Sequence, residues 1–340
     1  MDTWKRIARK FAMRSNPLAG KSNRSVPLPA QAKETCFTQS DTGFFIIFGC
    51  PRSGTTLLAQ CLSAHSKVFV PYETDIFIPC AFIMSRVSNL EIGKNMIADL
   101  ITNAYSFDLS LGKYLSVEEV RQSVTQSEYT LSTIFKNLFA LVGEKVGKPI
   151  VGDKSPNDMF DILALAQAGM LKEPVKVIHI VRDLRDAITS LNRQNWVDNA
   201  DVWFPRLWSD RNLFLQAHLR QAPNYFFLRY EDFVANPTKW LQSLTSFLNI
   251  EFEPHMLNTA SFPEYYKTVP AHRHLHDPIG TQRIGLWKKQ AAGQKILIYE
   301  AQAREALLNF GYLQASAEEG ARRNTQTCRS LRTTIQGVQR

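Results

Sequence analysis

The sequence of 340 residues predicts a single α/β domain with a central, mostly parallel β-sheet flanked by helices. Residues 44–48, FFIIF, form a continuous apolar run bounded by glycines, which is typical of a strand buried on both faces of a parallel sheet. A glycine-containing turn and an apolar helical pattern follow this run directly. Further short apolar runs alternate with helical patterns along the chain, and we find no internal repeats. This alternation predicts one sheet within one domain.

The first predicted unit is a βαβ motif. Strand 44–48 leads through a turn into a helix over 55–65, and residues 67–70 form a second short strand before Pro71. Residues 76–147 carry helical patterns without a nucleotide-binding motif. The later predicted elements are a strand within 148–156, a helix over 157–171, a strand within 174–183, a helix over 184–194, a strand over 224–233, a helix over 237–249 and a helical region near 286–310. This order is typical of a mostly parallel sheet.

Composition distinguishes the domain from its two ends. We predict a basic N-terminal segment and linker over 1–42, the α/β domain over 43–313 and a basic, disordered tail over 314–340. The formal charge of +9 indicates either an anionic partner or only basic tails. The five cysteines lack C-x-x-C spacing and favour a cytoplasmic location. Residues 1–16 alternate apolar and basic side chains at helical spacing, which leaves peripheral membrane contact open beside simple packing on the domain.

The turn after the first strand, GCPRSGTT, has the spacing of a phosphate-binding loop without its lysine. Gly49, Gly54 and Thr56 occupy the positions that the pattern G-x-x-x-x-G-K-[ST] requires, but Thr55 replaces the lysine. Backbone N–H groups and the helix dipole at such a turn favour an anion. With Arg52 as the cation, we predict a P-loop-like nucleotide-binding core for an anion shorter than a triphosphate. The alternative is a tight turn that binds no ligand.

The stretch PRSGTTLL after a buried strand resembles the 5′-phosphosulfate loop of sulfotransferases that use 3′-phosphoadenosine-5′-phosphosulfate (PAPS). That family holds the 3′-phosphate with an arginine at a strand end and a serine eight positions later, and Arg182 and Ser190 have this spacing. Open α/β sheets bind ligands at the carboxyl ends of strands, and the arginine fork suits a phosphate. Pairing of Arg182 with Asp183 or Asp186 is the alternative. The matching motifs lie within residues 43–290.

The same resemblance implies further contacts with the cofactor. Its 5′-phosphate would be bound by Ser53, Gly54, Thr55 and Thr56. Tyr230, in the RYED segment, would contact the adenine or ribose, unless it only packs at a strand end. Arg283 and Gly285, in RIGLWKKQ, would close over the 3′-phosphate.

Sulfuryl transfer needs a base for the acceptor hydroxyl and positive charge near the leaving phosphate. The tyrosylprotein and carbohydrate branches of the family place a glutamate base about as far beyond the loop as Glu73, with Asp75 as its competitor. The resemblance assigns charge stabilisation to Arg52 and Lys154, although Lys154 could instead pair with Asp153. A sulfuryl group carries less charge than a γ-phosphoryl group, so no metal is required.

The sequence therefore predicts an enzyme that transfers a sulfuryl group from PAPS to a hydroxyl and releases 3′,5′-bisphosphoadenosine (PAP). The acceptor could be a carbohydrate, a lipid, a phenol or another small molecule, and the sequence predicts neither its identity nor the oligomeric state. One rival is a P-loop kinase using Mg-ATP, which Thr55 and Arg182 disfavour. The other is a nucleic-acid-binding protein, which the scattered basic residues disfavour.

Two further segments bear on the acceptor and on charge. Segment 76–147 and the aromatic stretch 195–215 are predicted to shape the acceptor pocket. His272, His274 and His276 alternate in AHRHLHD, and this spacing fits either a metal site or a cationic loop beside an anionic ligand. The absence of further clustered ligands favours the cationic loop.

Overall fold

The computed structural model describes residues 43–194, 196–263, 269–290 and 293–314. The predicted N-terminal segment, residues 1–42, lies outside the described residues, and so does all but the first residue of the predicted tail. The described ranges therefore cover most of the predicted α/β domain.

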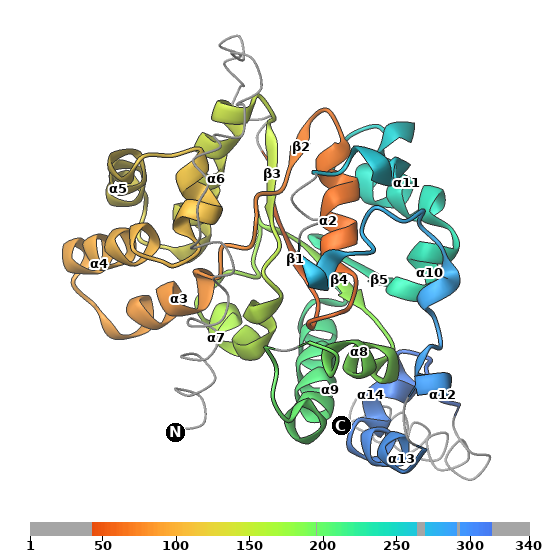
Figure 1. The fold of residues 1–340 in the computed structure, drawn as a ribbon. Coiled ribbons are helices and arrows are strands. Elements are labelled where there is room, and N and C mark those ends of the chain that lie inside the picture. Colours follow the sequence, from red (N-terminus) through yellow and green to blue (C-terminus); the bar gives the residue numbers. More distant parts are fainter. Residues whose placement is uncertain (1–42, 195, 264–268, 291–292, 315–340) are drawn as a thin grey trace, which may run out of the picture.

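Five parallel strands form one sheet in the order β2-β3-β1-β4-β5 (Figure 1). The strands are β1 (Gly43–Phe48), β2 (Val68–Phe69), β3 (Ile150–Asp153), β4 (Lys176–Val181) and β5 (Tyr225–Arg229). Four lie within segments predicted as strands, β1 begins one residue before its predicted segment, and the predicted parallel sheet is confirmed. Because parallel strands share one carboxyl edge, the segments that follow all five strands meet at that edge.

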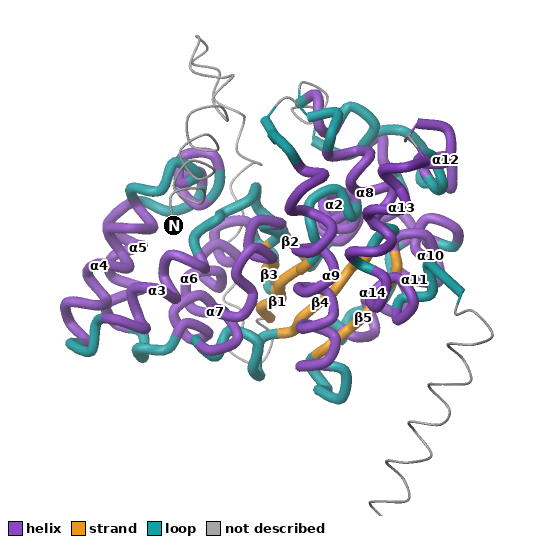
Figure 2. Tube along the Cα trace, turned by 90° about the horizontal axis from the view of Figure 1, so that it is seen from below, coloured by secondary structure: helices purple, strands orange, loops and turns teal. Residues whose placement is uncertain are grey.

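Helices cover both faces of the sheet, and Figure 2 shows the strands between them. One face carries α3 (Phe77–Arg86), α4 (Leu90–Thr102), α5 (Val117–Gln126), α6 (Leu131–Val146), α7 (Ile162–Gln167), α8 (Leu184–Leu191), α9 (Ala200–Leu219), α13 (Gly293–Gln302) and α14 (Arg304–Asn309). The other face carries α2 (Thr55–Ala64), α10 (Tyr230–Ala235) and α11 (Pro237–Phe247). The short α12 (Trp287–Gln290) packs on the first group through its tryptophan.

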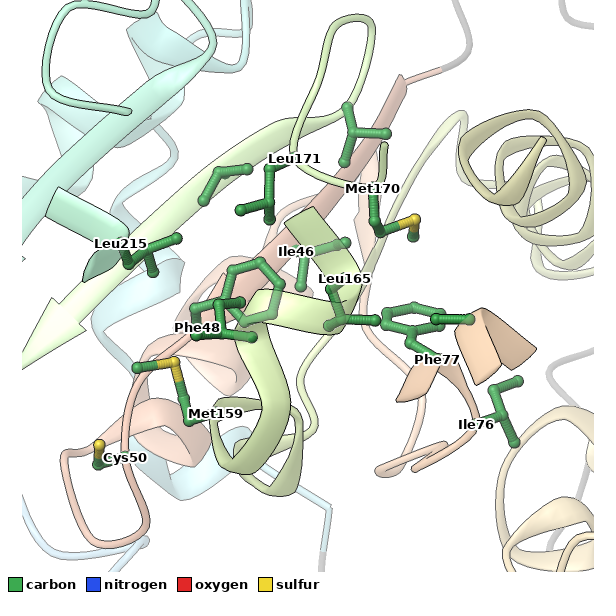
Figure 3. Packing of buried hydrophobic residues seen from close by; sticks show 14 of the residues in the cluster. Ile46, Phe48, Cys50, Ile76, Phe77, Met159, Leu165, Met170, Leu171 and Leu215 are labelled. Atoms are coloured by element: carbon green, nitrogen blue, oxygen red, sulfur yellow. The ribbon is translucent and has the colours of Figure 1, made fainter. Parts of the chain in front are cut away.

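The central strand β1 supplies both hydrophobic clusters because its side chains alternate between the two faces. Phe44, Ile46 and Phe48 belong to the larger cluster, and Figure 3 shows Ile46 and Phe48 within it. Phe45 and Ile47 belong to the cluster beneath α2 and α11. Full burial of a side chain of this size contributes about 1.5–3 kcal/mol to folding stability. The core therefore fixes β1, and with it the start of the loop that follows.

Two predicted boundaries were wrong. The helix predicted over 157–171 is a 3₁₀ segment, Pro156–Asp161, followed by α7, and the helical turn ends at Gly169, whose φ of 79° suits glycine. The strand predicted over 224–233 ends at Arg229, and α10 follows at once. Its neighbour β4 also ends there, since Val181 is the register partner of Arg229.

Two aromatic residues of the stretch that was predicted to shape the acceptor pocket lie in the core instead. Phe204 and Trp208 are completely buried in the core, and Trp208 Nε1 donates a hydrogen bond to the Arg182 carbonyl at 3.1 Å. These two residues therefore support strand β4 from inside the molecule.

In the described ranges, no helix combines the length and the apolar character that crossing a bilayer would need.

Candidate active site

The loop after β1 contains two residues in the left-handed region of backbone space. Arg52 has a φ of 71° and Gly54 a φ of 88°. Gly54 is the N-cap of α2, so Thr55 and Thr56 form the first turn, where backbone N–H groups lack intrahelical partners. A Cβ on Gly54 would lie 2.4 Å from Tyr230 Cδ2. Glycine therefore allows both the turn and the close approach of the tyrosine ring.

Arg52 crosses from this loop to two distant segments. Its Nε donates to Ser190 Oγ at 3.1 Å, and its Nη2 donates to the Ala271 carbonyl at 2.9 Å. Burial, and then repulsion by Arg182, lower the pKa of the Arg52 guanidinium to about 10. Arg52 therefore stays charged at neutral pH, beside the free end of the α2 dipole.

Arg182 emerges at the carboxyl end of β4 and lies against the same loop. Its Nη1 donates to the Arg52 carbonyl at 3.1 Å and its Nη2 to the Arg283 carbonyl at 2.8 Å. The guanidinium carbon lies 4.6 Å from the centroid of the Tyr230 ring, which is a cation–π contact. The structure thus brings together three predicted motifs: the loop with Arg52, the strand end with Arg182 and Ser190, and the segment with Tyr230.

The carboxylates that could have neutralised Arg182 bind other partners. Asp183 pairs with Arg185 at 2.7 Å. Asp186 accepts the Gly285 N–H at 2.7 Å, where Gly285 has a φ of 73°. The side chain of Arg283 pairs with Asp277 at 3.2 Å. The segment around Arg283 and Gly285 therefore lies across Arg182, but the Arg283 guanidinium contacts a carboxylate in this structure.

Lys154 joins the loop to the segment after β2. Its Nζ donates to Thr56 Oγ1 at 3.1 Å and forms a salt bridge with Glu73 Oε1. The Lys154 side chain is 2% exposed and the Glu73 side chain 21% exposed, so Glu73 is the more accessible partner. The alternative partner, Asp153, instead accepts a hydrogen bond from Thr74 Oγ1 at 2.7 Å.

Near this ion pair lie further buried carboxyl groups, and the sequence did not predict that they would lie together. Asp75, with a φ of 53°, accepts hydrogen bonds from Tyr105 and from Asn157. Burial, and then the Glu73 charge, raise the pKa of Asp75 to about 6, and burial raises the pKa of Asp153 to about 7. A raised pKa leaves Asp75 part protonated near neutrality and tied to its own partners. Glu73 is therefore the better placed carboxylate to contact a substrate.

The residues fit an anionic nucleotide. Ser53 Oγ and Arg182 Nε are both buried and have no hydrogen-bond partner within the described residues. Buried polar atoms of this kind are rare in native structures and need an account. Arg52 and Arg182 donate to backbone carbonyls here, which are weaker acceptors than a phosphate. This set of donors therefore suits phosphate groups.

A model of the sulfotransferase family matches residues 45–254. This chain belongs to the sulfotransferase family. Its matched region runs from β1 to the 3₁₀ segment Pro254–Leu257 and so includes the loop, Lys154, Arg182 and Tyr230.

Individual relatives of this chain are distant. Protein-tyrosine sulfotransferase 1 from Danio rerio is 25% identical over 252 residues, which cover 72% of this chain and 64% of that protein. An uncharacterised protein from Aquifex aeolicus (strain VF5) is 25% identical over 237 residues, covering 65% of this chain and 26% of that protein. The chain thus spans less than two thirds of both relatives. The solved sulfotransferase domain from the curacin biosynthetic pathway is 20% identical with a TM-score of 0.49, covering 77% of this chain and 97% of that domain.

A small cleft of about 90 Å³ is lined by residues of α2 and of the segment that leads to Glu73. Gln60, in α2, lines it one helical turn from Thr56, and Tyr72, beside Glu73 in the chain, forms another wall. The remaining lining residues are Ser63, Phe69, Val70, Pro71, Leu109, Lys113, Tyr114 and Pro263. Three of the lining residues belong to segment 76–147, which was predicted to shape the acceptor pocket.

The sequence predicted a cationic loop of three histidines beside an anionic ligand but did not indicate which histidine lies at the site. The structure places the His272 imidazole close enough to Lys154 and Arg52 for both charges to act on it. The sequence could not predict this proximity, because more than one hundred residues separate His272 from Lys154. The contact of Arg52 with Ala271 brings the two regions together.

Proposed function

We propose that this protein transfers a sulfuryl group from PAPS to a hydroxyl of an acceptor, giving a sulfate ester and PAP. The main observation is that the buried Arg182 and the half-buried Arg52 meet at a phosphate-binding loop that lacks the usual lysine. The family membership supports sulfuryl transfer over phosphoryl transfer. PAPS would supply the activated sulfuryl group, and no metal is part of the proposal.

Each element of the site has a proposed part in binding the donor. The N–H groups at the start of α2, with Ser53 and Thr56, would hold the 5′-phosphate. Arg182 and Ser190 would hold the 3′-phosphate, and Tyr230 would pack beside the nucleoside. The segment of Arg283 and Gly285 would cover the 3′ side, once the Arg283 side chain leaves Asp277.

In the proposed chemistry, Glu73 accepts the proton of the acceptor hydroxyl. Its salt bridge with Lys154 holds the carboxylate at the edge of the loop. Lys154 and Arg52 place two positive charges where negative charge develops, which is the arrangement that lowers such barriers most. The cleft beside Tyr72 would admit the acceptor, since it opens one helical turn from Thr56.

Replacing the proposed base tests this role. We expect Glu73→Gln to lower turnover by at least about 100-fold, because a general base contributes about 10²–10⁴-fold. PAP binding should change little. Turnover is measured as PAP release with a panel of phenols, sugars and alcohols, and melting temperatures check folding. Glu91→Gln, an exposed glutamate in the first turn of α4, is the control and should retain full turnover. Full turnover in Glu73→Gln would assign the base elsewhere.

Ligand-induced thermal stabilisation tests the function as a whole. PAP, ADP and Mg-ATP are compared at equal concentrations, since a ligand at 100 times its Kd stabilises by about 2.7 kcal/mol. The proposal expects a rise in melting temperature with PAP that clearly exceeds the rise with ADP. A rise with Mg-ATP alone would support the kinase instead. Salt-sensitive binding of mixed-sequence DNA without a PAP effect would favour a nucleic-acid-binding protein.

A further inference from the structure

Ser155, which follows Lys154 directly, connects two segments of the candidate site. Its Oγ accepts hydrogen bonds from two consecutive main-chain N–H groups, that of Thr74 at 3.0 Å and that of Asp75 at 3.2 Å. These two residues come directly after Glu73. One hydroxyl therefore joins the neighbour of the proposed cationic residue to the main chain beside the proposed base.

A second link lies on the other side of Lys154 in the chain. Asp153 Oδ1 accepts a hydrogen bond from Thr74 Oγ1 at 2.7 Å, and the Asp153 carboxyl group also forms a hydrogen bond with the Ser155 side chain. Thr74, Asp153 and Ser155 are each at most 1% exposed. Hydrogen bonds are stronger in such a buried setting than in water. The two neighbours of Lys154 thus hold the same short segment, residues 74–75.

Other contacts of this segment use different atoms. The Thr74 carbonyl accepts the Ser106 hydroxyl, and the Asp75 carboxylate accepts the Asn157 side chain. Because these contacts involve a carbonyl and a carboxylate, they leave the two main-chain N–H groups to Ser155. The Ser155 hydroxyl is therefore the group that fixes the main chain beside Glu73 against the end of β3.

The ion pair with Lys154 does not hold Glu73 through the whole of the proposed reaction. Glu73 loses its negative charge when it accepts the proton of the acceptor hydroxyl, and its attraction to Lys154 then falls. The hydrogen bonds that Ser155 accepts come from uncharged main-chain groups, so they persist through this change. We propose that Ser155 is a positioning residue, which holds the main chain beside Glu73 and keeps the carboxyl group in reach of the acceptor while the ion pair weakens. This inference rests on the proposed function, because Ser155 acts through the proposed base.

Ser155→Ala removes the hydroxyl and leaves the two N–H groups without their acceptor. We expect turnover to fall about 10- to 100-fold, because displacement of a reacting group by about 1 Å can cost about 100-fold. The Kd for PAP should stay nearly unchanged, since Ser155 contacts the segment of the base and not the phosphate loop. Turnover is measured as PAP release from PAPS, with water and with the panel of phenols, sugars and alcohols as acceptors. Calorimetric titration gives the Kd.

Ser127→Ala is the matched control. The Ser127 side chain is also buried, and its hydroxyl accepts a hydrogen bond from Asn137 at 2.8 Å and donates one to the Ser123 carbonyl at 2.7 Å. Ser127 ends α5, which packs on α4 and α6. The control therefore loses a buried hydroxyl of similar bonding away from the site. We expect a lower melting temperature for both variants and lower turnover for Ser155→Ala alone.

A double-mutant cycle shows whether Ser155 acts through Glu73. A residue that acts through the carboxylate has little further effect once the carboxylate is gone. We therefore expect Ser155→Ala to lower turnover much less in the Glu73→Gln background than in the wild type. An equal fold-loss in the two backgrounds would show that the effects are independent and would overturn the inference.

The remaining outcomes separate the inference from the proposed function. Wild-type turnover in Ser155→Ala overturns the inference and leaves the proposed function intact. If the wild type releases no PAP from PAPS, the proposed function fails, and the inference fails with it. If Ser155→Ala does not fold, hydrogen exchange of the wild type decides through the Thr74 and Asp75 amides. Protection equal to that of the β1 amides supports the inference, and exchange at the rate of unbonded amides overturns it.

Discussion

At the scale of single residues, Arg182 has more contacts across the candidate site than any one motif suggested. It donates to the carbonyls of Arg52 and Arg283 and lies over the Tyr230 ring. Its Nε has no partner among the described residues. A guanidinium in this setting is already oriented, so little side-chain entropy is lost when a phosphate replaces the carbonyls.

We therefore predict that Arg182→Ala weakens PAP binding about 10- to 100-fold. Hydrogen bonds to a charged partner contribute about 1.5–3 kcal/mol, and each 1.4 kcal/mol corresponds to a factor of ten. Calorimetric titration gives the Kd. Arg206→Ala, an exposed arginine on α9, is the control and should leave the Kd unchanged. Unaltered binding by Arg182→Ala would show that the ligand does not reach this strand end.

Spacing within a motif predicted which residues could act together, but not what they would contact. Arg182 and Ser190 lie eight residues apart, and the structure brings Ser190 against Arg52 instead of against Arg182 alone. Asp153 was predicted only as an alternative partner of Lys154, and His272 only as one of three histidines in a cationic loop, for a common reason. Each is tied to the site by a partner far away in sequence, Thr74 for Asp153 and Arg52 for the turn of His272.

At the scale of elements, the central strands were predictable because each is short, apolar and almost wholly buried. β1 and β4 each have five buried residues out of six, so neither needs the alternation of apolar and polar residues that a half-exposed strand has. The boundary at Arg229 was not predictable from propensity. Glu231, one residue into α10, accepts the Asp183 N–H at 3.0 Å, and this tertiary contact favours a helix in a segment rich in aromatic residues.

The pairing of β1 with β3 depends on a glycine. Gly152 is the register partner of Phe45, and a Cβ at Gly152 would lie 2.3 Å from the Phe45 ring. The ring is completely buried and has no free space to move into. We predict that Gly152→Ala lowers the free energy of unfolding by about 1–3 kcal/mol, as overpacked cores do. Urea denaturation measures the loss.

The matched control for this change is Gly293→Ala at the start of α13. A Cβ there meets nothing within 4 Å. Alanine in a helix at such a site stabilises by about 0.4–1 kcal/mol because it restricts the unfolded chain. Equal effects of the two substitutions would contradict the proposed role of the Phe45 ring.

At the scale of the whole molecule, buried titratable groups act on stability in opposite directions. Burial raises the pKa of Asp153 to about 7, so its contribution is greatest at low pH and is lost as the pH rises through 7. Burial lowers the pKa of His179 to about 4, so its contribution is present above pH 6.5 and is lost as the pH falls through 4. The stability of the wild type should therefore vary little between pH 5 and 7, because the two kinds of group offset each other.

Replacing Asp153 removes its contribution to the pH dependence of stability and leaves the contribution of His179. Asp153→Asn keeps an acceptor for Thr74 but no longer titrates. Between pH 5 and 7, the wild type loses roughly 2 kcal/mol through Asp153, at up to about 1.4 kcal/mol for each pH unit, and the variant loses none of it. We therefore expect Asp153→Asn to be more stable relative to the wild type at pH 8 than at pH 5, by up to about 3 kcal/mol in urea denaturation. Asp210→Asn, on the exposed side of α9, should show the same difference from the wild type at both pH values. If Asp153→Asn behaves like Asp210→Asn, then Asp153 is ionised in the folded protein at pH 5, and the flat pH profile must have another origin.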